Sequence, residues 1–129
     1  MSNVPVPGNY VSEDKNFTFK ISSADSSNGV ISGVYNASYS PVGPLTAEGN
    51  IGHYSWVFNK AQGKDGVAPF VISFGGSARP NGRPYCISDA WNGAYQTDNS
   101  ILAEGVRSFV NQDGVVQVRS LGTLRFAIG

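Results

Sequence analysis

The sequence predicts an all-β domain, folded as an antiparallel up-and-down barrel of about eight strands. Val (14), Ile (7) and 15 aromatic residues supply most of its apolar material, and these types fit a pleated, half-buried strand. Leu occurs only 4 times and Glu only 3 times, which leaves little for helices. With 16 Gly and 7 Pro, turn signals separate short apolar runs at near-regular spacing. Few charged residues are present to protect strand edges, and closure into a barrel removes those edges.

The first third of the chain has the clearest alternation. Residues 1–7 predict an irregular N-terminal arm. In residues 17–22, Phe17, Phe19 and Ile21 alternate with polar side chains, which predicts a strand with one wet face. Residues 24–29 end in Asn-Gly, which favours a tight hairpin turn, and residues 29–36 are expected to return antiparallel to that strand.

The middle of the chain is punctuated by Gly and Pro. Residues 40–44 break the pattern. The elements expected after this break are strands at 45–50 and 54–60, a polar loop at 61–66, a strand covered on both faces at 67–74 and a loop at 75–84.

The last part of the chain predicts four further strands. Residues 101–110 are compatible with a strand or one short helical stretch, and a strand is favoured. Asn111-Gln112-Asp113-Gly114 predicts a second hairpin turn. The remaining expected elements are a strand at 85–91, a polar segment at 92–100 and strands at 115–120 and 121–128.

Length and charge exclude several classes of protein. A chain of 129 residues is expected to form one domain over 1–129. Zero formal net charge with 14% charged residues argues against nucleic acid as a partner. No stretch approaches the roughly 20 apolar residues of a membrane-spanning helix. No secretory signal is visible at the N-terminus.

One cysteine and one histidine carry little chemistry. Cys86 is the single cysteine, so no intrachain disulfide is expected, which slightly favours the cytoplasm as a compartment, and Cys86 itself is expected to be a small buried hydrophobe. One histidine, His53, cannot supply a usual metal cluster, and no Gly-x-Ser-x-Gly elbow or phosphate loop is present. The sequence therefore predicts no enzyme, no cofactor and no metal.

The sequence instead offers aromatic residues beside small polar groups. Such mixtures line pockets for uncharged ligands, although many of these rings are expected to fill the core. The candidates are Tyr35, Tyr39, Tyr54, Trp56, Phe58, Phe74, Tyr85, Trp91 and Tyr95.

Several segments resemble the avidin and streptavidin family. Residues 28–35, Asn-Gly-Val-Ile-Ser-Gly-Val-Tyr, are similar to a turn followed by its Gly-x-Leu-Thr-Gly-x-Tyr strand. Further segments follow in the family's order over residues 8–91, with gaps: Gly8-Asn9-Tyr10, the strand at 17–21, Pro44-Leu45-Thr46, the segment 54–59 and the segment 87–91.

The resemblance implies an eight-stranded barrel that binds biotin at one end and is usually tetrameric. It implies that Tyr35 binds the ureido ring, that Phe58 and Trp91 belong to an aromatic cage, and that Ser12 and Asn16 are the polar pair of the first loop. With Tyr54 added from the aromatic strand, these residues form the predicted ligand-binding set.

The chain also departs from that family. Ala37 stands where a binding serine is expected, Phe58 where the cage has tryptophan, and Ser12 where the family has asparagine. The family's Trp-Lys pair and its late ureido-binding aspartate have no match. Each lost hydrogen bond leaves a polar group of the ligand unpaired, so biotin binding is expected to be weakened or lost.

Two functional hypotheses follow. The first is a non-enzymatic binding protein with a cup for a biotin-like small molecule. The second is a surface recognition module, for a glycan or a host protein, that uses the loops at 61–66, 75–84 and 92–100. Its contacts would be Trp91, Asn92, Tyr95, Arg79 and Arg83.

A weaker third hypothesis is a barrel-type protease inhibitor that presents one loop. A homo-oligomer, dimer or tetramer, is also expected, with Val115-Val116 and residues 124–128 on the outer apolar face.

Overall fold

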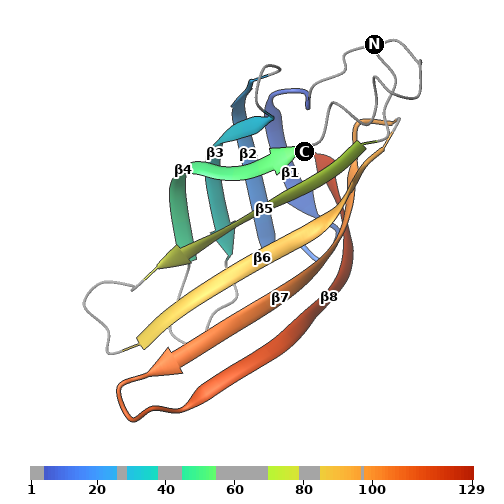
Figure 1. The fold of residues 1–129 in the computed structure, drawn as a ribbon. Helices are drawn as coiled ribbons and strands as arrows, with labels where there is room; N and C mark the ends of the chain where they lie inside the picture. Colours follow the sequence, from blue (N-terminus) through green and yellow to red (C-terminus); the bar gives the residue numbers. More distant parts are fainter. Residues whose placement is uncertain (1–4, 26–28, 38–44, 55–69, 79–84, 97) are drawn as a thin grey trace.

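The computed structural model is an all-β barrel, which confirms the predicted fold class. It describes residues 5–25, 29–37, 45–54, 70–78, 85–96 and 98–129. Within these residues, eight antiparallel strands follow one another around a closed barrel in chain order, and β8 returns to pair with β1 (Figure 1). The strands are β1 (Gly8–Ser12), β2 (Phe17–Ala24), β3 (Val30–Ala37), β4 (Leu45–Tyr54), β5 (Phe70–Ala78), β6 (Tyr85–Tyr95), β7 (Ile101–Asn111) and β8 (Val116–Ile128).

The barrel interior is an aromatic core. Side chains alternate between the interior and solvent along β2, so Phe17 and Phe19 are buried whereas Lys20 is exposed. Phe19 and Phe74 stack with ring centroids 4.4 Å apart. Edge-to-face contacts join four strands, β2, β5, β6 and β8: Phe17 with Trp91 at 5.0 Å, Trp91 with Phe126 at 5.0 Å and Phe74 with Phe126 at 5.2 Å.

The two halves of the barrel are joined by short seams. β1 pairs with β8 only over Tyr10–Ser12 and Phe126–Ile128, and β4 pairs with β5 only over Gly52–Tyr54 and Ile72–Phe74. From Phe126, β8 continues back to Val116 beside β7, about 30 Å past the seam at the usual strand rise. β6 to β8 therefore overhang the end of the barrel that carries the turn at 13–16 (Figure 1). We call this end the mouth.

Residues 5–7 of the N-terminal arm lie at the opposite end of the barrel. The Tyr10 hydroxyl donates to the Val6 carbonyl oxygen at 2.5 Å, and the Val6 amide donates to the Tyr95 hydroxyl at 3.1 Å. Tyr95 donates in turn to Asn99 Oδ1 at 3.2 Å. Burial, followed by the hydrogen bond with Tyr95, raises the pKa of Tyr10. Residues 5–7 form no strand and Pro5 is buried.

Both predicted hairpin turns are confirmed where the structure describes them. The amide of Asp25 donates to Val30 O at 2.9 Å, and Gly29 has a φ of 76°, a left-handed conformation that glycine adopts without strain. At the second turn, Gly114 has a φ of 79° and its amide donates to Asn111 O at 3.1 Å. The strand favoured at 101–110 is also confirmed, as β7.

Several predicted boundaries are wrong. β4 is one strand through 45–54, without the break expected after residue 50. β5 continues through 75–78, because these residues pair with β6. Gly75 is a glycine inside this strand because a Cβ there would lie 2.1 Å from the Asp89 carbonyl oxygen. β6 runs on to Tyr95, whose ring faces the core. The strand expected at 54–60, the loop at 61–66 and residues 79–84 lie largely or wholly outside the described residues.

The last two predicted strands are one strand with a β-bulge. The pairing changes from Gly105 with Gly122 to Val106 with Ser120, so Leu121 is the extra residue. The φ of 87° at Gly122 accommodates this shift. Because a bulge reverses which side chains face inward, the alternation changes phase at Leu121 and the segment looks like two strands in the sequence.

Two predictions of burial are also wrong. Cys86 is exposed, because it lies on the outer face of β6 opposite Val110. The segment 124–128 was expected on the outer apolar face, but Phe126 within it is fully buried. Val116 and Ile128 do lie on the outside and are 65% and 51% exposed.

Candidate functional site

A buried hydrogen-bonded network lies between the aromatic core and the mouth. The Tyr35 hydroxyl of β3 donates to Asp89 Oδ2 at 2.7 Å, and Trp91 Nε1 donates to the Tyr35 oxygen at 3.0 Å. Arg107 donates to the same carboxylate through Nε (2.7 Å to Oδ1) and Nη2 (2.8 Å to Oδ2). We call these four residues the floor network.

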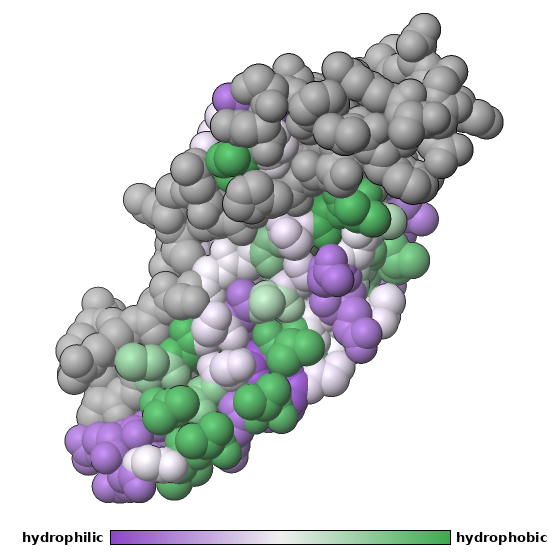
Figure 2. Space-filling view, viewed as in Figure 1, coloured by the Kyte–Doolittle hydropathy of each residue, from purple (hydrophilic) through white to green (hydrophobic). Residues whose placement is uncertain are grey.

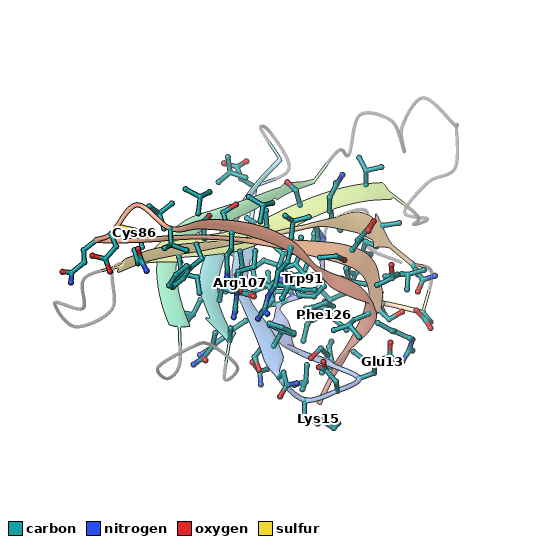
Figure 3. All side chains as sticks on the ribbon, turned by 90° about the horizontal axis from the view of Figure 1, so that it is seen from below. Glu13, Lys15, Cys86, Trp91, Arg107 and Phe126 are labelled. Carbon is teal, nitrogen blue, oxygen red and sulfur yellow. The ribbon has the colours of Figure 1, made fainter. Side chains whose placement is uncertain are left out.

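The strand register brings the floor network together. Asp89 and Arg107 are direct cross-strand partners on β6 and β7, and both face the interior. Trp91 faces inward two residues from Asp89, as side-chain alternation requires. Figure 3 shows Trp91, Arg107 and Phe126 on the interior side of the β6 to β8 sheet. Glu13 lies beside β8, where its amide donates to the Arg125 carbonyl oxygen at 2.9 Å.

Burial controls the electrostatics of the floor. Asp89 and Arg107 are each 2% exposed, and a buried charge is tolerated when it is paired and hydrogen-bonded. Burial raises the pKa of Tyr35, and the charge of Asp89 raises it further. Tyr35 therefore stays protonated and acts as a donor to Asp89.

A pocket lies at the mouth, between the first turn and β8. Its volume is about 300 Å³, at the lower end of the range for small-molecule sites. It is lined by Asp14, Asn16, Phe17, Arg119, Ser120 and Leu121. A smaller cavity of about 80 Å³ is lined by Arg107, Phe109, Gln117 and Arg119. Because both cavities share Arg119, this residue connects the pocket to the floor network.

The first turn forms one wall of the pocket. Asp14 Oδ1 accepts hydrogen bonds from Ser12 Oγ at 2.6 Å and from the Asn16 amide at 3.0 Å, while Oδ2 accepts from Asn16 Nδ2 at 3.3 Å. Ser12 Oγ also accepts from the Phe17 amide at 3.0 Å. These bonds hold Lys15 at a φ of 67° and fix the position of Asn16 at the pocket.

The structure brings together only part of the predicted ligand-binding set. Tyr35 and Trp91 are in direct contact in the floor network, and Asn16 lines the pocket. Ser12 is fully buried, and its hydroxyl donates to Asp14 and accepts from the Phe17 amide within the turn. Tyr54 is the last residue of β4, paired with Ile72. Phe58 lies outside the described residues.

The charged members of the site were not found from the sequence. Asp89, Arg107 and Arg119 were not assigned to the predicted set. A signal exists for Asp89, because it shares the inward phase of Ile87 and Trp91 on one strand, and an ionisable residue in that phase requires a partner.

Of the three described residues expected to contact a surface partner, two are buried. Trp91 and Tyr95 are each 1% exposed and belong to the core. Asn92 is exposed on the outer face of β6. Arg79 and Arg83 lie outside the described residues.

Across the described part of the chain, no three His, Cys, Asp or Glu side chains are grouped as metal ligands. Nor do those residues include a helix with the length and hydrophobicity to cross a membrane. Comparison of the sequence and fold with protein-family models, with curated proteins and with solved structures finds no match.

Proposed function

We propose that this chain is an avidin-like, non-enzymatic binding protein that takes a small molecule at the mouth of its barrel. The observation that carries the proposal is the pocket of about 300 Å³ between the first turn and β8. It combines an apolar surface from Phe17 and Leu121 with polar groups from Asn16 and Arg119. Pockets of this composition bind small ligands by apolar contact and orient them by a few polar contacts.

The floor network argues that the ligand lies above Tyr35 rather than against it. The resemblance assigns the Tyr35 hydroxyl to the ureido oxygen of biotin, but this hydroxyl already donates to Asp89 at 2.7 Å. A ligand that reached it would have to displace a buried, charge-assisted hydrogen bond, which is among the stronger kinds. Biotin in the depth of the barrel is therefore disfavoured, and the mouth pocket is the proposed site.

A fragment screen by ligand-observed NMR, with biotin among the compounds, tests the proposal. Leu121→Trp is expected to fill the pocket and to remove the signals of most hits. Thr123→Trp is the matched control, because Thr123 lies on the same strand but is exposed opposite Glu104. Hits that are lost in Leu121→Trp and kept in Thr123→Trp support the mouth site. Hits whose binding signals are unchanged in Leu121→Trp, or a screen that finds no hits, contradict the proposed site.

We also propose that the protein is a homo-oligomer that associates through the outer face of β6 to β8. Val106, Val110, Val116 and Val118 are 40% to 66% exposed there. Val110 is paired with Val116, and Ser108 with Val118, so the far part of this face presents valine and serine without charge. Figure 2 shows apolar residues gathered over the far ends of these strands. Uncharged apolar faces of this kind are typical of interfaces, and a second copy supplies a face of the same chemistry.

A further inference from the structure

We infer that the outer edge of β8, formed by the backbone of Val116, Val118 and Ser120, pairs with the same edge of a second copy of this chain. Two barrels would then share one continuous sheet. The inference goes beyond the proposed function, because it names a second surface besides the outer face of β6 to β8 and does not depend on the ligand of the pocket.

β8 has a strand partner on only one side over most of its length. β7 pairs with it from Val116 to Phe126, whereas β1 reaches only as far as Ser12, opposite Phe126. Just past Ser12, the Glu13 amide still donates to the Arg125 carbonyl oxygen at 2.9 Å. Among the described residues, no strand pairs with this side of β8 from its first residue up to that contact. Figure 1 shows this part of β8 as the outer border of the overhanging sheet.

A hydrogen bond at the hairpin turn shows which backbone groups point to the outer edge. The Asn111 amide donates to the Val115 carbonyl oxygen at 3.1 Å, so the backbone of Val115 faces β7. Hydrogen-bonding groups alternate between the two sides along a strand, so those of Val116, Val118 and Ser120 face away from β7. These three residues therefore present their N–H and C=O groups at the outer edge.

This edge lacks the usual protection against pairing with another strand. Natural sheet edges often carry Lys or Pro, bulge away or are covered by another element. Residues 116–120 contain neither Lys nor Pro, and the bulge lies beyond them at Leu121. Val116 and Val118 are 65% and 66% exposed, so no other element covers them. An edge of this kind is a template for an extended strand.

The spacing of the edge groups favours a second copy of the same strand. A two-fold axis through Val118 places Val118 opposite its own copy and Val116 opposite Ser120. All three pairs are then hydrogen-bonded pairs, which together form about six backbone hydrogen bonds. On the interior side, the same register places Arg119 opposite Gln117, which avoids a direct pair of like charges. The edge is therefore complementary to itself in hydrogen bonding and in charge.

Edge pairing is compatible with association through the outer face. The two-fold axis of an antiparallel pair is perpendicular to the sheet, so the outer faces of both copies lie on the same side. Val106 and Val110, which are 40% and 45% exposed on β7, keep their exposure in such a pair. The edge alone gives a dimer, and the edge together with the outer face gives a tetramer.

A proline at the centre of the edge tests the pairing. Val118→Pro removes the central amide and is expected to halve the mass of the wild-type species in sedimentation velocity. The circular dichroism spectrum should not change, because proline is tolerated on an edge strand where its nitrogen faces away from the neighbouring strand. Val118→Thr is the matched control: it keeps the amide and a β-branched side chain, and it should sediment as the wild type does.

Amide hydrogen exchange in the wild-type protein gives a second readout that needs no variant. The internal reference is the amide of Thr123, which faces away from β7 as Arg125 does and lies outside the proposed pairing. In the oligomer, the amides of Val116, Val118 and Ser120 are expected to exchange at least about tenfold more slowly than this reference.

The outcomes separate the edge from the proposed outer face. Val110→Lys places a charge on the outer face but not on the edge. A lower mass in Val118→Pro with an unchanged mass in Val110→Lys supports the edge and contradicts the face. An unchanged mass in a folded Val118→Pro overturns the edge inference, whatever Val110→Lys does.

Two further results would also overturn the inference. If Val118→Pro does not fold, edge amides that exchange as fast as that of Thr123 in an oligomeric wild-type sample decide against the pairing. A wild-type monomer at high concentration contradicts both the edge and the face, and would leave the edge to an extended strand of another protein.

Discussion

Arg107 and Asp89 form a two-point ion pair in the barrel interior, with N–O distances of 2.7 and 2.8 Å and almost no exposure to solvent. Tyr35 donates to the same carboxylate, so the pair ties β3 to β6 and β7. This arrangement places two buried charges where the avidin-like resemblance expects space for a ligand. The floor of the cup is therefore made by the protein itself.

Removing one partner of this pair should be strongly destabilising. Arg107→Met leaves the Asp89 carboxylate buried without its counter-ion, which typically costs about 3–5 kcal/mol of unfolding free energy. The double variant Asp89→Leu/Arg107→Met should recover much of that loss, because it removes both charges. Urea denaturation measures both effects. As a control, Arg125→Met breaks an exposed pair with Asp98 and should leave the midpoint unchanged. A single variant as stable as the wild type would contradict the account of the floor.

Glycine is required at position 105 of β7 because the indole ring of Trp91 packs directly over it. A Cβ at this position would lie 2.8 Å from three atoms of the Trp91 indole. Gly105→Ala should therefore displace the indole, weaken its 3.0 Å hydrogen bond to Tyr35 and lower stability by about 1–3 kcal/mol. The indole N–H signal and the urea midpoint are the measurements. Glu104→Ala, on the exposed side of the same strand, should change neither; equal behaviour of the two variants would rule out this packing role.

Alkaline pH should destabilise the fold through its buried tyrosines. Burial raises the pKa of Tyr10 and of Tyr35 above the ordinary value of 10.0. The unfolded chain then loses these protons at lower pH than the folded chain does, so stability is fully present below about pH 10 and falls as pH rises above it. Urea midpoints between pH 8 and pH 11 test this. Tyr35→Phe should flatten the decline, and an unchanged slope in that variant would show that Tyr35 ionises normally.

Charge on the valine face should dissociate the proposed oligomer. Val116→Lys/Val118→Lys places two ammonium groups in the apolar patch and should give a monomer in sedimentation velocity, with an unchanged circular dichroism spectrum. Thr123→Lys, exposed on the same strand but outside the patch, should leave the assembly intact. A wild-type protein that sediments as a monomer at high concentration would refute the proposal.

The fold was predictable because its strongest signals are local. Phe17, Phe19 and Ile21 alternate with polar residues, and Asn-Gly and Asp-Gly occur where the hairpins turn. Where strands ended was less predictable. Gly75 suggests a loop in the sequence, but in the structure it is a strand residue in close contact with the neighbouring backbone. Side-chain pattern alone does not contain that contact.

The site was less predictable than the fold, because it depends on register and on one bulge. Asp89 and Arg107 are 18 residues apart, and only the pairing of β6 with β7 brings them together. Leu124 and Phe126 set an inward phase that, continued toward the N-terminus, would turn Arg119 outward. The bulge at Leu121 reverses that phase and places Arg119 inside. Nothing in the local sequence marks this reversal except Gly122.

We propose that a small molecule binds at the mouth and leaves the floor network closed, and a crystal structure with the tightest-binding fragment tests this proposal most directly. We expect density for the fragment between Asn16, Phe17 and Arg119, with the hydrogen bond from Tyr35 to Asp89 intact. Density inside the barrel with that bond broken, or on the outer face of β6 to β8, would contradict it.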